Sequence, residues 1–454
     1  MQPKDSHQKV SWTVVILLYS QINIDSADVV VNNGNLGKSE PNQKAQTQEF
    51  RRLIANLPFQ KEDPVFVIYN QVNPLDFGRQ NDYTELSQLN IDKKDFVTIK
   101  KYETPGVFQE PDKLSSVLRD LRPLLPSSGN LLLMTWDHGA VYGMFKKFKV
   151  PRGTQQSDAA EKATYVDMLT PDELAQSITQ GLRRKVDLLI LMNCWMQNCH
   201  TLHGLSDVAN YMVASEGLIT SFVYDYSIFN RLANRASLDV AKDITQNLLK
   251  EYTYKYASTF HLDNQVDTCS IFTTVYGEDF TRFMQSLKKF IDYLLDLLKT
   301  NAQAGLIARF ILDSRNSVFC WDKGENGSFN YWMVDFLALL IHFSNAIVAD
   351  ARFAGDTAVQ HLKDKVMELN SLQAIVMPDP TIGAHPYEVV GPPIPRNYVG
   401  RPSGTGIFFP PDQPAMDNSF YSKELKKNNQ IGFYTTANPN WLVLLKRYYQ
   451  LLKS

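Results

Sequence analysis

The sequence is poor in cysteine and has almost no net charge. Its 454 residues include only four cysteines, which are too few and too scattered for a disulfide framework: Cys194, Cys199, Cys269 and Cys320. A formal net charge of −2 gives no general attraction to nucleic acid or to an anionic membrane. Reduced thiols are therefore the default state, and a thiol is available for chemistry.

Long hydrophobic runs free of polar residues are also missing. The apolar segment 10–19 follows two lysines, but polar residues interrupt it and no clear cleavage pattern follows. We interpret it as a first strand rather than a signal peptide. The stretch 331–348 contains Asp335 and His342, which favours a buried helix over a membrane span. We therefore expect a soluble protein of unknown location, secreted if a leader was removed and otherwise cytoplasmic.

The composition is that of an ordinary globular protein, with 44% hydrophobic and 21% charged residues. In the first half, strand-like segments alternate with helix-like segments. This alternation is typical of an α/β fold with a mainly parallel sheet flanked by helices. Beyond residue 275 the pattern becomes helical and mixed. We predict one domain over 8–275 and a helical and mixed C-terminal region over 276–454 that packs on it.

Periodicity and end signals place the individual elements. The predicted strands are 12–18, 64–69, 96–100, 131–136, 186–192, 218–224 and 406–410. The predicted helices are 46–56, 112–121, one that begins at Pro171, 205–214, 280–298, 332–349, 357–369 and 441–449. The helix at Pro171 has a complete start signal, since Thr170 precedes it and Glu173 follows at the third helical position.

Two of the apolar runs end in reactive side chains. The run 131–136 leads to His138 and Gly139, and the run 186–192 leads to Cys194. The carboxyl ends of parallel strands meet at one edge of a sheet, where open α/β sheets hold their sites. A histidine and a thiol at that edge are sufficient for a cysteine nucleophile with an acid/base partner.

Each residue at these strand ends has a chemical role in this hypothesis. Cys194 attacks a carbonyl, His138 protonates the leaving amine, and the backbone N–H groups of Gly139 and Cys194 form an oxyanion hole. Strand alternation places Asp137 on the opposite face, so we assign it a structural role. The alternative is that Cys194 is a packing residue at the end of an apolar strand, as buried cysteines usually are.

Beyond these strand ends, the sequence resembles the clostripain family, in the clan that also contains caspases, legumains and gingipains. The matching motifs follow the family's order along the chain: Ser11-Trp12-Thr13-Val14, Trp136-Asp137-His138-Gly139, Thr170-Pro171-Asp172-Glu173-Leu174, Cys194-Trp195-Met196, Ala214-Ser215-Glu216, Tyr224-Asp225-Tyr226 and Gly404 to Pro410. The resemblance implies a caspase-like fold and a cysteine endopeptidase that acts through a thioester acyl-enzyme. It also implies that His138 and Cys194 form the catalytic dyad and that Gly139 lines the oxyanion hole.

The chain departs from the family at the expected S1 pocket. The family usually has Asp-Ala-Cys, and its Asp helps to bind a basic P1 side chain, whereas this chain has Met192-Asn193-Cys194. Asp225, in the segment that resembles the family's Trp-Asp-Tyr, would retain one carboxylate that could bind a guanidinium. We therefore assign Met192 and Asp225 to the S1 pocket and leave a basic and an apolar P1 preference open.

A polar stretch over 144–163 separates the histidine strand from the cysteine strand. The family is commonly cleaved between these strands, so the resemblance implies a self-processing loop whose candidate residues are Lys147, Lys149 and Arg152. The alternative is an ordinary exposed loop. We expect no organic cofactor and no metal site. Calcium dependence occurs in the family, but no Asp-rich loop with calcium-ligand spacing is present.

The expected partner is a peptide or protein substrate, with no nucleic acid and no membrane, and the expected state is a monomer. Two other functions remain open. A degenerate member of the family could keep the fold as a binding or scaffold protein, and an acyl-enzyme resolved by an amine would make the protein a transpeptidase.

Overall fold

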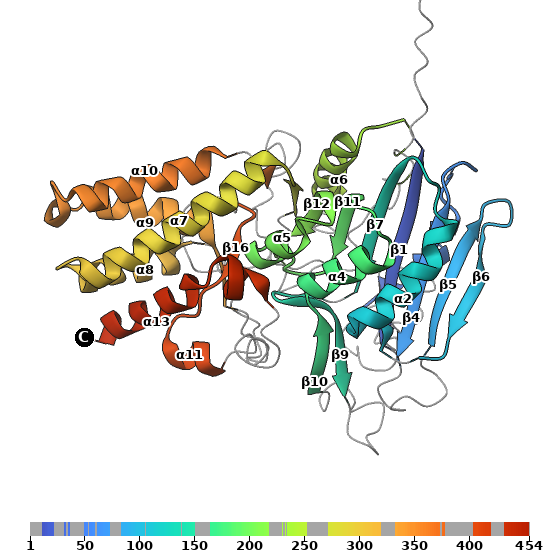
Figure 1. Ribbon diagram of the computed structural model, residues 1–454, viewed down its shortest axis with the longest axis horizontal. Coiled ribbons are helices and arrows are strands. Elements are labelled where there is room, and N and C mark those ends of the chain that lie inside the picture. The colour runs from blue at the N-terminus through green and yellow to red at the C-terminus, as the bar shows by residue number, and fades with distance from the viewer. Residues whose placement is uncertain are drawn as a thin grey trace, which may run out of the picture.

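The protein is an α/β sheet with helices on both faces, beside a region of long helices (Figure 1). The computed structural model describes residues 11–21, 31–32, 35–36, 50–52, 54–59, 61–72, 83–104, 106–137, 139–149, 164–217, 229, 232, 234–251, 271–318, 332–372, 375–376, 403–418 and 431–453. Within these ranges no helix is long and apolar enough to cross a membrane.

The main sheet has nine strands in the order β15-β13-β12-β11-β7-β1-β4-β5-β6. Their bounds are β1 Trp12–Gln21, β4 Val65–Val72, β5 Tyr83–Asn90, β6 Asp95–Tyr102, β7 Asn130–Trp136, β11 Val186–Met192, β12 Ala209–Ser215, β13 Ile271–Val275 and β15 Ile375–Val376. The central strands β4, β1, β7, β11 and β12 run parallel, and antiparallel strands complete both margins. The predicted mainly parallel sheet between helices is confirmed.

The central strands are apolar on both faces because helices cover both sides of the sheet. Leu131, Leu133 and Leu189 pack with side chains of α2 (Pro111–Leu121), α4 (Pro171–Gly181) and α5 (Cys199–Leu205). The intervening residues Leu132 and Ile190 belong to a second cluster, with α6 (Ser237–Glu251) and the helical segment near residue 50. The start signal predicted for α4 is present, since Thr170 and Glu173 form a complete capping box.

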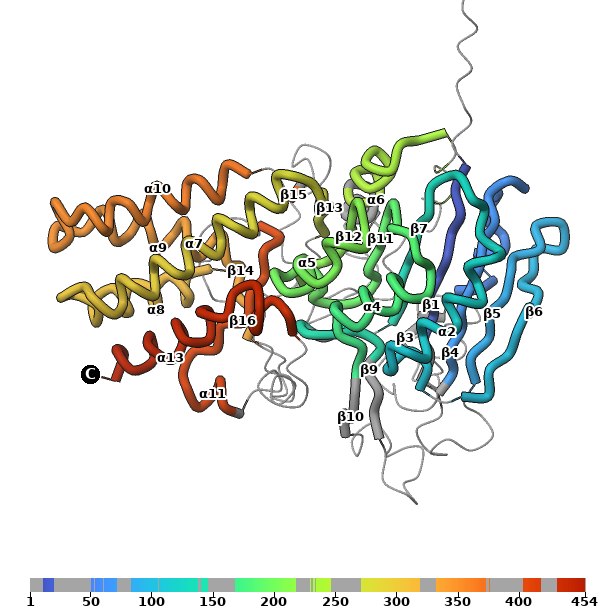
Figure 2. Tube along the Cα trace, in the orientation of Figure 1, coloured from blue at the N-terminus to red at the C-terminus, as the bar shows by residue number. Residues whose placement is uncertain are grey.

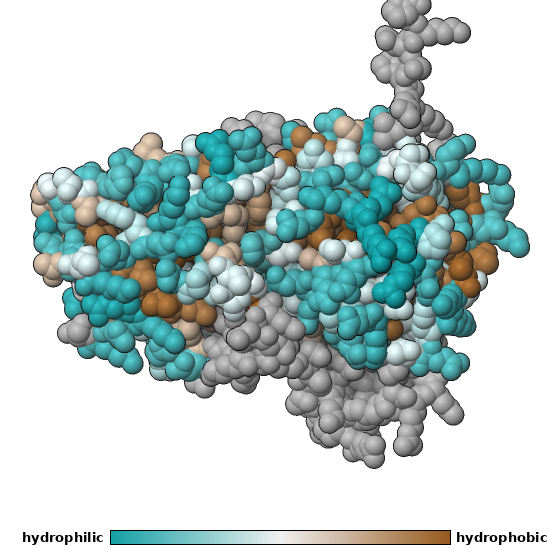
Figure 3. Space-filling view, in the orientation of Figure 1, coloured by the Kyte–Doolittle hydropathy of each residue, from teal (hydrophilic) through white to brown (hydrophobic). Residues whose placement is uncertain are grey.

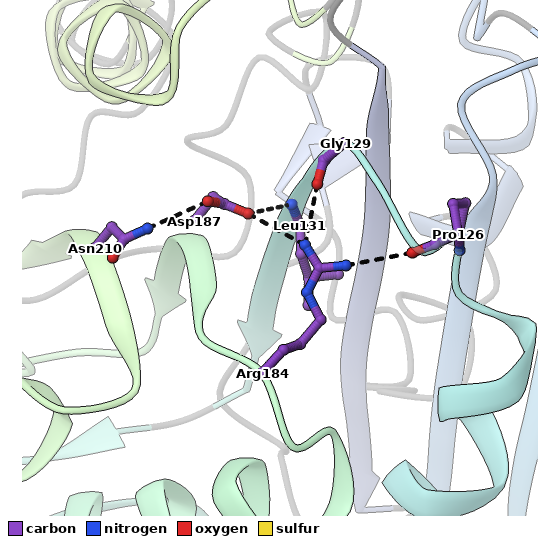
Figure 4. Close-up of polar contacts among 6 residues, drawn as sticks. All are labelled: Pro126, Gly129, Leu131, Arg184, Asp187 and Asn210. Atoms are coloured by element: carbon purple, nitrogen blue, oxygen red, sulfur yellow. Dashed lines mark hydrogen bonds and ion pairs between the residues drawn. The ribbon is translucent and has the colours of Figure 1, made fainter.

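The register of β7 and β11 aligns their carboxyl ends, because Trp136 lies beside Met192. A polar network holds the opposite ends of the same strands (Figure 4). Asp187 accepts hydrogen bonds from the backbone N–H of Leu131 at 2.8 Å and from the Asn210 amide at 3.2 Å. Arg184 lies 3.5 Å from the same carboxylate and donates to the Gly129 carbonyl. The two strand ends that lead to His138 and Cys194 therefore have a fixed alignment.

Some predicted elements were wrong. The segment predicted as a helix over 205–214 is instead the end of α5 followed by strand β12. The strand predicted over 218–224 lies outside the described residues. Strand β5 was missed, because its buried residues include Thr84, Glu85 and Ser87, and so it lacks an apolar pattern.

The stretch predicted as a loop over 144–163 begins as regular structure. Strand β9 (Gly143–Lys149) pairs antiparallel with β10 (Thr164–Leu169), and β8 (Gly139–Ala140) pairs with the start of β9. This hairpin projects below the main sheet in the view of Figure 1. Residues 150–163 lie outside the described part of the chain.

The C-terminal region is built from long helices that extend away from the sheet (Figure 2). They are α7 Glu278–Thr300, α8 Ala304–Ser317, α9 Phe336–Ala349, α10 Thr357–Ser371 and α13 Asn440–Lys453, and a shorter helix, α11, covers Gln413–Asn418. The predicted helices at 280–298, 357–369 and 441–449 are confirmed, whereas α8 was missed. A short pair of strands, β14 (Met333–Asp335) and β16 (Gly406–Phe408), lies beside them. Side chains of these helices and of the sheet share one apolar core.

The surface shown in Figure 3 is mainly hydrophilic. Apolar side chains reach it in scattered groups, one of them over the end of the molecule that holds β5 and β6. Edge strand β6 has two exposed apolar residues, Val97 and Ile99. The domain boundary at 275/276 stays a prediction. It coincides with the end of β13, and β15 from the second region adds the outermost strand beside β13.

Candidate active site

Two turns meet at the carboxyl edge of the sheet, one after β7 and one after β11. Gly139 in the first lies directly against Cys194 in the second. A Cβ atom on Gly139 would lie 2.2 Å from the Cys194 carbonyl oxygen and 2.7 Å from the Cys194 backbone nitrogen. No side chain fits at such distances, so only glycine permits this approach. Gly139 and Cys194 therefore lie side by side at this edge of the sheet.

The turn that carries Cys194 has a constrained backbone. Cys194 is 8% exposed, and the next residue, Trp195, adopts a left-handed conformation with φ of 57°. A bulky residue adopts this conformation only where its surroundings enforce it, and such strain is common at functional sites. The Trp195 N–H donates to the Gly217 carbonyl at 2.9 Å, and the Gln197 N–H donates to the Ser215 carbonyl at 2.8 Å. The end of β12 therefore supports the turn.

Two buried asparagines flank Cys194 and connect its turn to the turn after β7. The Asn193 amide donates to the Asp137 carbonyl at 2.8 Å and accepts a hydrogen bond from the Thr135 hydroxyl. The Asn198 amide donates to the Val141 carbonyl at 2.8 Å and to the Trp195 carbonyl at 2.7 Å. Its side-chain oxygen also caps helix α5 by accepting from the Thr201 N–H.

Several predicted site residues lie outside the described part of the chain. His138 is one of them, although its neighbours Asp137 and Gly139 are both described. Asp225 and Arg152 are outside it as well. The backbones of Lys147 and Lys149 lie in strand β9, opposite Asp167 and Thr164 of β10.

Met192, predicted to line the S1 pocket, is the last residue of β11 and is 5% exposed. It lies in the same apolar cluster as Trp136, Ile190 and Val240. Its surroundings are those of an apolar side chain, and an unpaired carboxylate here would carry a large desolvation cost.

A segment from the C-terminal region completes the wall of the site. The backbone N–H of Gly404 donates to the carboxylate of buried Glu216 at 3.0 Å. The Gly404 carbonyl accepts from the Gln197 amide at 3.1 Å, and Gly406 forms a parallel bridge with Asn198. Residues 403–406, here called the strap, therefore contact the Cys194 turn.

The strap donates hydrogen bonds to two buried acids, from Gly404 to Glu216 and from Ser403 to Asp335. Burial raises the pKa of Glu216 well above its usual range, and nearby Asp335 adds to the shift. Burial likewise raises the pKa of Asp335 from 3.8 to about 6, although hydrogen bonds from Ser403 and Ala338 partly oppose this. Both acids lie in the protein interior beside the strap, so their protonation affects its stability.

The other thiol and the imidazoles near Cys194 are packed into the core. Cys199 is fully buried, and burial raises the pKa of its thiol. Burial, together with His203, lowers the pKa of His200 to about 3, so this imidazole is neutral near pH 7. In the described ranges no group of three or more His, Cys, Asp or Glu residues is placed to hold a metal ion.

Sequence reasoning assigned no role to Asn193, Gln197 or Asn198. Their position in the sequence could have indicated a role, since all three lie within four residues of Cys194 and follow β11. A buried amide in such a turn must satisfy its own donors and acceptors, and it therefore forms hydrogen bonds to neighbouring backbone.

A thiol at the carboxyl edge of this sheet, beside the glycine that follows a histidine, is typical of the caspase-like class of cysteine peptidases. The model of the clostripain family matches residues 56–352. The chain belongs to the clostripain family and is a cysteine peptidase, a hydrolase.

The fold is similar to two solved structures. One is a secreted C11 cysteine protease from Bacteroides thetaiotaomicron in complex with an irreversible peptide inhibitor, at a TM-score of 0.52 and 12% identity over 94% of this chain and 99% of that chain. The other is an inactive zymogen C11 protease from Parabacteroides distasonis, at a TM-score of 0.52 and 13% identity over 92% and 97% of the two chains. A search of curated proteins finds no match.

Proposed function

We propose that this peptidase is an endopeptidase in which Cys194 is the nucleophile and His138 is the acid/base. The observation that carries the proposal is the contact between Gly139 and the Cys194 backbone. His138 immediately precedes Gly139 in the sequence, which supports its assignment as the partner of the thiol. No other described cysteine has such a setting, since Cys199 is fully buried.

The reaction has two steps. The Cys194 thiol gives its proton to His138 and its sulfur attacks the carbonyl carbon of the scissile bond. The carbonyl oxygen becomes an oxyanion that the N–H groups of Gly139 and Cys194 stabilise. His138 gives a proton to the leaving amine as the C–N bond breaks, leaving a thioester. Water, deprotonated by His138, then attacks the thioester and releases the acid and the thiol. The residues in these roles require no organic cofactor or metal.

The S1 pocket in this proposal has an apolar wall at Met192, with Asp225 as the second candidate residue. The burial of Met192 among apolar side chains supports an apolar or mixed P1 preference. A basic preference requires that Asp225 binds the substrate cation by itself. A cleavage profile on a peptide library separates the two, because a predominance of Arg or Lys at P1 would contradict the apolar assignment.

We also propose that the chain processes itself between β9 and β10. Lys149 ends β9 and Arg152 follows it in the sequence, so a basic residue lies at the start of this connection. Intact mass after incubation tests this. We expect cleavage in the wild type and an intact chain for Cys194→Ala, whereas equal cleavage in both would exclude self-processing.

The test of the peptidase proposal is covalent labelling of Cys194. An electrophilic peptide ketone should add its mass to the wild-type chain at Cys194, as located by peptide mapping, and hydrolysis should stop. Cys194→Ala should take no label and hydrolyse nothing, whereas Cys199→Ala should keep both properties. An inert Cys194 would favour a scaffold role, and amide products formed with an added amine would favour transpeptidation.

A further inference from the structure

We infer that Asn193 and Asn198 are positioning residues of the peptidase reaction: their amides hold Asp137 and Val141, which lie on either side of His138 in sequence, against the turn of Cys194. This inference rests on the proposed function. One asparagine precedes Cys194 by one residue and the other follows it by four. Each donates to a carbonyl of the facing turn, Asn193 to Asp137 and Asn198 to Val141, both at 2.8 Å.

The two acceptor carbonyls lie on either side of His138 in sequence. The Asp137 carbonyl belongs to the peptide bond that joins Asp137 to His138, so the Asn193 bond fixes a group directly attached to the histidine. The Val141 carbonyl lies on the far side of Gly139. The two amides therefore hold both ends of the segment 137–141 to the turn of Cys194.

Burial makes these bonds strong determinants of the geometry. Asn193 is 1% exposed and Asn198 is 0% exposed, so water does not readily replace a lost partner. Both hydrogens of the Asn198 amide are used, one on Val141 and one on Trp195. The Thr135 hydroxyl donates to the Asn193 oxygen, which orients that amide so that its nitrogen faces Asp137. Both side chains are therefore held in one orientation.

The close contact between Gly139 and Cys194 leaves little room for a change in the separation of the two turns. The turns already approach so closely that a methyl group does not fit between them. Loss of either amide should allow the two turns to separate, so that the groups they carry are no longer aligned for the reaction. Displacement of about 1 Å costs roughly 100-fold in rate in enzymes that depend on such alignment.

The test uses variants that remove a connection but keep the other roles of each residue. Asn198→Ser retains an oxygen that can cap α5 but loses the amide that reaches Val141. Asn193→Ala removes the bond to Asp137, and Thr135→Val removes only the hydroxyl that orients Asn193. Asn70→Ala is the matched control. Asn70 is also fully buried, and its amide donates to Thr84 and Tyr83 of β5, while strand β1 separates its own strand β4 from β7.

The measurement is hydrolysis of a fluorogenic peptide that the wild type cleaves, as a function of pH, with thermal melting of every variant. We expect Asn193→Ala and Asn198→Ser to lower kcat about 10- to 100-fold with little change in KM, and to move the limb of the pH profile that depends on His138. We expect Thr135→Val to have a smaller effect in the same direction. Asn70→Ala should lower the melting temperature and leave kcat and the pH profile unchanged.

A cycle with His138→Ala separates positioning from general stabilisation. If the asparagines act through His138, their substitution should cost far less in the His138→Ala background than in the wild type. Equal losses in both backgrounds, or an unchanged kcat in both asparagine variants of an active enzyme, would overturn this inference alone. A wild type that neither hydrolyses peptides nor takes label at Cys194 would overturn the proposed function, and this inference with it.

Discussion

The turns around Cys194 and the helical region beyond residue 277 both have buried side chains, yet different interactions hold them. The turns contain polar side chains such as Asn193, Gln197 and Asn198, each bonded to backbone of another segment. The helical region instead packs aromatic and aliphatic side chains, with Trp441 in edge contact with Phe336 and Phe409. Hydrogen bonds have direction and apolar contacts do not, so the first region fixes geometry and the second mainly supplies stability.

The largest effect on stability is expected from the helical region. Phe343 of α9 is fully buried, so Phe343→Ala should lower the free energy of unfolding by about 3–5 kcal/mol. Urea unfolding measures the loss. If this region mainly supplies stability, kcat of the folded Phe343→Ala variant should stay at the wild-type value. Phe343→Leu should show a smaller loss of stability. A large fall in kcat for the folded protein would mean that this region also fixes the site.

Gly139→Ala should act mainly on activity, whereas Phe343→Ala should act on stability. Its Cβ would overlap the Cys194 carbonyl, so the two turns must part and kcat should fall about 100-fold, equivalent to about 2.7 kcal/mol. Steady-state kinetics on the fluorogenic peptide measure it. The matched control is Gly277→Ala, because a Cβ at that position meets nothing within 4 Å. Wild-type kcat in Gly139→Ala would show that the contact with Cys194 is not needed for activity.

Loss of the polar network around Asp187, at the opposite edge of the sheet, should have an effect of intermediate size on stability. Asp187→Ala leaves the Leu131 N–H and the Asn210 amide without their acceptor, so stability should fall by about 1–3 kcal/mol. Asp187→Asn keeps an acceptor for Leu131 and should lose less. Urea unfolding of the two variants provides the comparison. If Asp187→Ala instead lowered kcat at unchanged stability, this network would belong with the site and not with the scaffold.

The smallest expected effect is a dependence of stability on pH that arises from Glu216. The folded protein holds the Glu216 proton more tightly than the unfolded chain, whose carboxyl has its ordinary pKa of 4.5. The folded state therefore binds more protons above pH 4.5, and the contribution of Glu216 to stability falls as pH rises from there through its raised pKa. Glu216→Gln should remove this fall. Its melting temperature relative to the wild type should increase between pH 4 and pH 8, and a constant difference would contradict a buried, protonated Glu216.

Sequence reasoning succeeded where the local pattern and the final environment agree. β7 and β11 are continuous apolar runs, and the start of α4 has a capping box, so both kinds of element were predicted correctly. The juxtaposition of Gly139 and Cys194 followed from the rule that parallel strands end at one edge. P1 preference did not follow, because it depends on which side chains converge on Met192.

The errors have physical reasons as well. The apolar segment that forms β12 is short, and a short apolar run fits a buried helix and a buried strand equally well. The buried polar residues of strand β5 form hydrogen bonds with residues that are distant in sequence, such as that between Thr84 and Asn70. The roles of Asn193 and Asn198 were missed for the same reason, since their acceptors lie more than 50 residues upstream.

The strap determines when the site can form during folding. The Gln197 amide bonds to the Gly404 carbonyl, a partner 207 residues further along the chain. While the ribosome is still synthesising the intervening residues, the wall of the Cys194 turn is missing that partner, although the sheet strands β1, β4, β7 and β11 are already available to pair. The loop between these two residues must also close before the bond can form. The wall around the nucleophile can therefore be complete only when nearly the whole chain has been made.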